Sequence, residues 1–75
     1  MNKERRARLR LAKNKLSEIL EEIESILSDE DEMRDNMPEN LQNSDRYEES
    51  ERCSEAMEAT VGHIEDAIDS IEEVA

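Results

Sequence analysis

The sequence predicts an all-α fold: a two-helix antiparallel hairpin, patterned in heptads, that assembles as a dimeric four-helix bundle. Aliphatic residues recur every three or four positions in both halves of the chain, as in packed helices. The only proline, Pro38, lies midway between the halves. A chain of 75 residues with one cysteine has no disulfide to reinforce a small core, so self-association is expected. Residues 1–75 are therefore taken as one domain.

The first helix is expected over about residues 3–35, because one stripe of positions is apolar at all but one place. The stripe holds Leu9, Ala12, Leu16, Ile19, Ile23, Ile26, Glu30, Met33 and Met37. Leu20 and Leu27 lie one residue beyond it and widen it to the width that helix bundles use.

The turn is expected over about residues 36–44, since Pro38 pushes the residue before it out of the helical region. Ser44 or Asp45 then caps a second helix over about residues 45–74. The stripe of that helix holds Tyr47, Ser50, Ser54, Met57, Val61, Ile64, Ile68, Ile71 and Ala75, with Cys53, Thr60, Ala67 and Val74 along one edge. Equal helices with a short connection favour a hairpin over one long helix per chain.

Two helices alone cannot bury stripes of this width, so two hairpins packed face to face are expected. The predicted oligomer core consists of Leu16, Ile19, Ile23, Ile26, Met57, Val61, Ile64, Ile68 and Ile71.

Charge is abundant and polarised along the chain. The net charge is −12, yet residues 1–15 carry seven cations against one acid, and residues 16–75 carry 21 acids against three cations. A hairpin lays the basic N-terminus beside the acidic C-terminus. The predicted acidic face consists of Asp29, Asp31, Glu32, Glu48, Glu49, Glu55 and Glu58. Ordered carboxylates on a rod imitate duplex phosphates and suit a basic groove.

Enzyme chemistry is not expected. Cys53 and His63 are ten residues apart on one helix, about 15 Å, too far for a nucleophile and its base. The acidic run at residues 28–32 lacks the glycine of a calcium loop, so no metal or cofactor is predicted. Gly62, in the middle of a helix, is either a tolerated weak spot or a place of close approach.

Membrane and nucleic-acid partners are also not expected. No apolar run reaches about 20 residues, and a lone cysteine without a secretory leader suggests a cytoplasmic protein. Direct nucleic-acid binding by the basic N-terminus is opposed by the acidic net charge and by the lack of stacking aromatics.

The region after the turn contains a candidate binding tip formed by Arg46, Tyr47 and Arg52. Arginine and tyrosine are frequent anchors in recognition, and arginine suits phosphates, so a small anionic ligand is a second possibility there.

Two segments, DNMPENLQNSDRYEESE and EAMEATVGHIEDAIDSIEEV, carry a resemblance. They resemble small acidic helical-hairpin proteins encoded by phages and prophages of Gram-positive bacteria, from Asp35 to Val74, most specifically over Asn36–Ser44. That group has no established activity. The resemblance implies the cytoplasm of an infected or lysogenic host, where small phage proteins bind host proteins or sequester signalling molecules.

Three functions remain open. The leading hypothesis is a non-enzymatic phage-type protein that binds and inhibits a host factor, such as a defence or nucleic-acid-binding protein, through its acidic helical faces. The second is an oligomeric sponge that sequesters a nucleotide or another small signalling molecule. The third is a structural coiled-coil adaptor.

Overall fold

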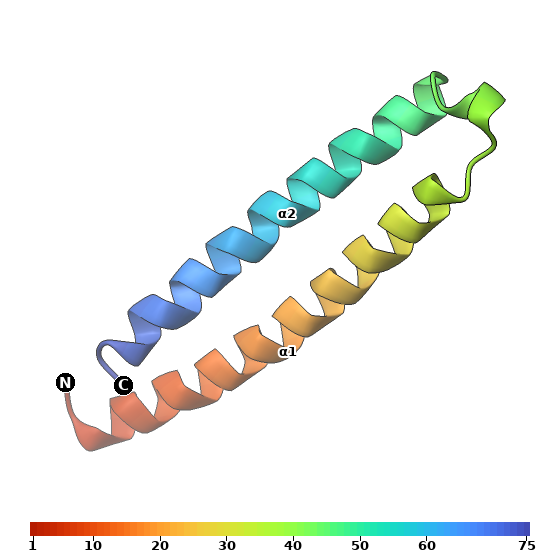
Figure 1. The fold of residues 1–75 in the computed structure, drawn as a ribbon. Coiled ribbons are helices and arrows are strands. Elements are labelled where there is room, and N and C mark those ends of the chain that lie inside the picture. Colours follow the sequence, from red (N-terminus) through yellow and green to blue (C-terminus); the bar gives the residue numbers. More distant parts are fainter.

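The protein is a hairpin of two long antiparallel helices (Figure 1). The computed structural model describes all of residues 1–75, with α1 at Lys3–Asp35, a short 3₁₀ turn η1 at Glu39–Leu41 and α2 at Asp45–Glu72. There is no β-strand. The molecule measures 59 × 14 × 12 Å, and both chain ends lie at the same end of this rod (Figure 1). The predicted all-α hairpin is confirmed.

Side-chain caps define where each helix begins. The Asn2 side chain accepts a hydrogen bond from the backbone N–H of Arg5 at 2.8 Å and caps α1. Ser44 caps α2 in the same way, because its Oγ accepts the N–H of Tyr47 at 3.3 Å. The Ser44 hydroxyl also donates to the carbonyl of Leu41 at 2.6 Å, which ties the cap to η1. At the other end α2 stops at Glu72, two residues before the predicted Val74.

The side of α2 that packs on α1 coincides with the stripe expected from the sequence. Its positions are half-buried or buried, namely Tyr47, Ser50, Ser54, Met57, Val61, Ile64, Ile68, Ile71 and Ala75. On α1 the packed side is displaced by one column of the heptad. Leu9, Leu16, Ile23, Glu30 and Met37 are half-buried as expected, but Lys13, Leu20, Leu27 and Arg34 accompany them. Ala12, Ile19, Ile26 and Met33, which the sequence placed in this seam, are exposed.

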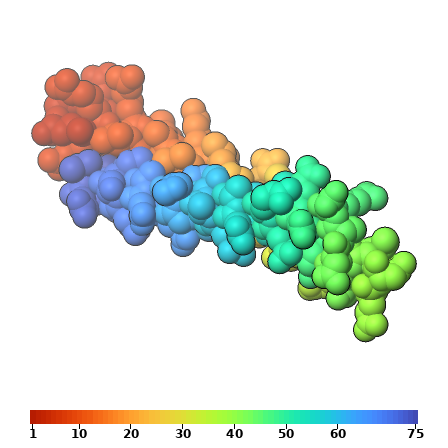
Figure 2. Space-filling view, turned by 90° about the horizontal axis from the view of Figure 1, so that it is seen from above, coloured from red at the N-terminus to blue at the C-terminus, as the bar shows by residue number.

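The hairpin has very little core of its own. The two buried residues are both polar, Ser50 and Ser54, and no apolar side chain is fully buried. The space-filling view shows a thin rod in which α2 lies in front of much of α1 (Figure 2). Its accessible surface is 5822 Å². A compact monomer of 8.7 kDa exposes about 4,700 Å². The excess, roughly 1,000 Å², is similar to what one partner buries in a stable protein interface.

The apolar stretches of α1 and α2 are both too short and too interrupted by charge to cross a bilayer.

Replacing Gly62 by alanine is expected to raise the free energy of unfolding by about 1 kcal/mol. Gly62 lies inside α2, has no positive φ, and a Cβ built there would meet nothing within 4 Å. The gain therefore comes from backbone entropy alone, with no clash against it. Urea unfolding of both proteins at one fixed concentration measures the difference. A loss of stability would show that another molecule approaches Gly62 closely.

Candidate interaction surfaces

One side of the rod presents an apolar face that nothing in the hairpin covers. We define it by two columns of exposed residues with heptad spacing: Ala12, Ile19, Ile26 and Met33 on α1, and Cys53, Thr60, Ala67 and Val74 on α2. Met33 and Cys53 line one shallow groove together, which places the two columns on the same side of the seam. Ile19 and Ile26 expose about half of their surface, 46% and 50%. Both belong to the predicted oligomer core.

The opposite side of the rod is acidic. We define this acidic face by Glu24, Asp31, Glu51, Glu58, Glu65 and Glu72. Glu24, Asp31 and Glu58 line one groove between the helices. Glu51, Glu65 and Glu72 lie on the same side of α2 as Glu58, because they are seven or fourteen residues away from it. Two of these carboxylates form ion pairs, Asp31 with Arg34 and Glu72 with Lys13. The remaining carboxylates on this side are free to meet a partner.

The acidic residues predicted from the sequence are spread more widely than one face. Asp31 and Glu58 line the acidic groove, and Glu48 and Glu55 occupy the adjacent column of α2. Glu49 instead borders the groove that contains Met33 and Cys53. Asp29 and Glu32 are exposed on the outer side of α1. In the sequence, this face is indicated by the seven-residue spacing of Glu51, Glu58, Glu65 and Glu72. The runs of consecutive acidic residues do not indicate it.

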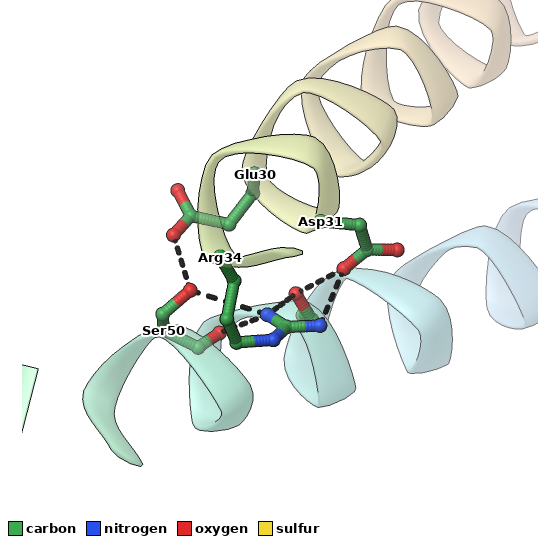
Figure 3. A network of polar contacts seen from close by, with 5 residues as sticks. Glu30, Asp31, Arg34 and Ser50 are labelled. Atoms are coloured by element: carbon green, nitrogen blue, oxygen red, sulfur yellow. Dashed lines mark hydrogen bonds and ion pairs between the residues drawn. The ribbon is translucent and has the colours of Figure 1, made fainter. Parts of the chain in front are cut away.

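A polar cluster joins the two helices near the turn, where Arg34 reaches from α1 across to α2 (Figure 3). Its Nη1 donates to the Ser54 hydroxyl at 2.7 Å and to the Ser50 hydroxyl and carbonyl at 3.1 and 3.2 Å. Its Nη2 pairs with Asp31 at 2.8 Å. The two serine hydroxyls in turn donate to carboxylates of α1, Ser50 to Glu30 at 2.6 Å and Ser54 to Asp31 at 2.7 Å. No buried side-chain polar atom is left without a partner.

The small serines make room for this arginine. Ser50 and Ser54 expose 4% and 3% of their surface, so a larger side chain at either position would displace the guanidinium. The cluster also shifts two pKa values. The hydrogen bond from Ser54 is the main cause that lowers the pKa of Asp31, with Arg34 adding to it against a smaller effect of burial. Burial opposes the charge on Arg34, but the hydrogen bond and charge of Asp31 outweigh it and raise the pKa of Arg34.

Acidification is expected to remove the stabilisation that Asp31 provides. Its folded-state pKa lies below the ordinary value of 3.8, so this contribution is complete above about pH 4 and is lost as the pH falls through the folded-state pKa. The variant Asp31→Asn has no carboxyl group to titrate at this position. The difference in melting temperature between wild type and Asp31→Asn, followed by circular dichroism from pH 7 to pH 2.5, should therefore shrink below pH 4. A constant difference would contradict the assignment.

The basic N-terminal segment finds few partners within the chain. Lys13 pairs with Glu72 at 3.6 Å, and Arg10 donates to the Ala75 carbonyl at 3.4 Å. The sequence suggested a more extensive pairing with the acidic C-terminus. Lys13 reaches Glu72, the last residue of α2, and Arg10 reaches the last residue of the chain, so the start of α1 extends beyond the end of α2. The cations Lys3, Arg5, Arg6 and Arg8 in that projection form no ion pair.

The residues of the candidate binding tip point in different directions. Arg46 lines a groove at the turn with Met33, Pro38 and Leu41, on the side of the apolar face. Tyr47 is half-buried in the seam, and Arg52 is exposed on the outer side of α2. Within one hairpin these three side chains therefore form no common pocket.

No group of three or more histidine, cysteine or acidic side chains is arranged to hold a metal ion. No protein-family model, curated protein or solved structure matches the chain.

Proposed function

We propose that the protein is a non-enzymatic interaction protein: a homodimeric four-helix bundle whose outward acidic faces bind a basic surface on a host protein and block it. The observation that supports this best is the opposition of the two faces. The apolar face and the acidic face lie on opposite sides of the seam between α1 and α2. A dimer formed through the apolar face leaves the acidic face of each hairpin turned outward.

The charge pattern suits a partner that normally binds nucleic acid. Glu51, Glu58, Glu65 and Glu72 repeat along α2 every seven residues, about 10.5 Å, on a rod 59 Å long. Fixed carboxylates in a row create a negative potential that steers a basic groove toward them. Occupation of that groove by the rod competes with nucleic acid. The resemblance to small acidic phage proteins supplies the setting, a bacterial host protein as target.

The test uses an acidic-face variant and a control with the same change in charge. Glu51→Gln/Glu58→Gln/Glu65→Gln removes three charges from the acidic face. Glu18→Gln/Glu32→Gln/Asp66→Asn removes three from the exposed outer sides of the helices. Each protein is immobilised, incubated with bacterial lysate at physiological salt, and the retained proteins are quantified with and without added duplex DNA.

We expect wild type and control to retain a basic protein that duplex DNA displaces. The acidic-face variant should retain it roughly tenfold less, since three partly exposed charge pairs are together worth about one factor of ten in affinity. Equal retention by all three proteins, or a partner that duplex DNA leaves in place, would refute the proposal.

A further inference from the structure

We propose that the second copy of the chain binds the apolar face in an antiparallel orientation, so that α1 lies against α1 of the partner and the two turns point to opposite ends of the bundle. This inference rests on the dimer of the proposed function and adds its geometry. A symmetric face-to-face dimer has two choices: the twofold axis runs across the rod, which pairs α1 with α1, or along the rod, which pairs α1 with α2.

The contacts between the helices fix which residues share a level of the rod. Arg34 meets Ser50 and Ser54 near the turn, and Lys13 meets Glu72 near the open end. The apolar face therefore forms four rows, Met33 with Cys53, Ile26 with Thr60, Ile19 with Ala67, and Ala12 with Val74. The middle of these four rows lies between the row of Ile19 and the row of Ile26. An axis across that point places Ile26 of one copy opposite Ile19 of the other.

Charge favours the axis across the rod. Residues 1–15 carry a net charge of +6, from seven cations and one acid, whereas residues 16–35 carry −8, from nine acids and one cation. When α1 pairs with α1 in antiparallel orientation, the basic half of each copy lies beside the acidic half of the other. The axis across the rod also places the acidic α2 beside α2 of the partner, but the axis along the rod places residues 16–35, the most acidic segment, beside the N-terminal half of α2, which is also acidic. Like charges at that distance repel.

The projecting N-terminus points to the same orientation. Met1, Arg5 and Arg8 line a groove with Leu9 and Ala12, which continues the α1 column of the apolar face beyond the end of α2. At the other end of the rod a second groove, lined by residues that include Met37, Pro38 and Leu41, continues the same face around the turn. Only the antiparallel orientation brings the first groove of one copy over the second groove of the other.

This contact would cover apolar surface that the hairpin leaves open. Met1 and Leu41 expose 62% and 45% of their surface. Arg5 and Arg8 of the projection would also come close to Asp35 and Glu39 of the partner. With the axis along the rod, the N-terminal groove has no helix opposite it, because α2 ends at Glu72, and the turn groove meets the partner's turn.

A distance measurement between two copies tests the orientation. Asn43 is exposed in the turn and does not line the turn groove, so a spin label there leaves the interface intact. The native thiol is removed by Cys53→Ala, and Asn43→Cys carries the label. At 1.5 Å per residue, the antiparallel dimer separates the two labels by about 60 Å, whereas the other orientation brings them within about 20 Å. Sedimentation of the same sample gives its mass.

The outcomes separate the two proposals. A dimer mass with the long distance supports the antiparallel orientation. A dimer mass with the short distance, or with both distances, overturns the orientation and leaves the dimer standing. A monomer mass overturns both. As a second readout, Arg5→Glu/Arg8→Glu should weaken the dimer by roughly tenfold or more, because it reverses charges that face the partner's acidic turn. An unchanged dissociation constant would count against the antiparallel orientation.

Discussion

Replacing Ile26 by lysine is expected to dissociate the proposed dimer, raising its dissociation constant by roughly 100-fold or more. Ile26 exposes 50% of its surface in the hairpin and lies near the middle of the apolar face. In the proposed four-helix bundle that position is enclosed by the partner, so the ammonium group would lose its water at a cost that the carboxylates of Glu22 and Glu30 offset only in part. Sedimentation over a range of protein concentrations measures the change.

Leu11→Lys is the matched control for this prediction. Leu11 exposes 63% of its surface, more than Ile26, but it points away from α2 and from the apolar face, on the outer side of α1. The same chemical change there should leave the mass unaltered. The prediction is wrong if Ile26→Lys remains dimeric at the concentrations where wild type does, or if both variants dissociate alike.

Helix content is expected to fall when the proposed dimer dissociates. The hairpin buries no apolar side chain completely, and a chain this short needs further buried surface to offset the entropy of ordering. In Ile26→Lys the far-ultraviolet circular dichroism should therefore depend on protein concentration more steeply than in wild type.

The hairpin itself could be predicted from the sequence, because the residues that end α1 and begin α2 act locally. Pro38 stops α1, and the Ser44 hydroxyl starts α2 by accepting one N–H group. The seam of α2 also followed from periodicity, because the flanking positions outside it are less apolar.

The side of α1 that packs on α2 differs by one heptad column from the predicted side, because the apolar stripe of α1 is three columns wide. Ile19 and Leu20 are neighbours and are equally suited to a core, so periodicity alone cannot tell which of them faces α2. Leu20 does, and Ile19 is left on the apolar face. The choice depends on which column of α2 lies opposite, and that is a tertiary property. The width of the stripe nevertheless indicated that one apolar column would remain outside the seam.

The polar cluster left only a partial signal in the sequence. Glu30 interrupts one apolar stripe, and Ser50 and Ser54 interrupt the other at the level that a hairpin brings opposite. The sequence pattern did not indicate Arg34, because its heptad column was expected on the surface of α1 and not in the seam. Matching the polar interruptions of one helix to those of the other would have found the site, although not its central cation.

Removal of that cation by Arg34→Met should lower the melting temperature by roughly 10 °C. The guanidinium donates to three oxygens of α2 and one carboxylate of α1. Without it, Glu30 and Asp31 keep only the hydroxyls of Ser50 and Ser54 as partners, and the cluster has no positive charge. Arg52→Met makes the same chemical change on the exposed outer side of α2 and should have no measurable effect. Thermal unfolding of the three proteins at equal concentration tests this, and equal melting temperatures would refute it.

A variant in which the whole cluster is apolar separates stability from specificity. Combining Arg34→Leu with Glu30→Leu, Asp31→Ala, Ser50→Ala and Ser54→Ala removes every polar partner at once, so no group is left unsatisfied. Such replacements are often as stable as the ion pair they remove, and we expect the melting temperature to return at least to that of wild type. Elsewhere the seam consists mostly of aliphatic side chains, which can exchange partners between registers, whereas the hydrogen bonds of the cluster need one register. The variant should therefore show more than one set of amide resonances by NMR, where wild type shows one. A single set would mean that the turn alone fixes the register and that Arg34 contributes only stability.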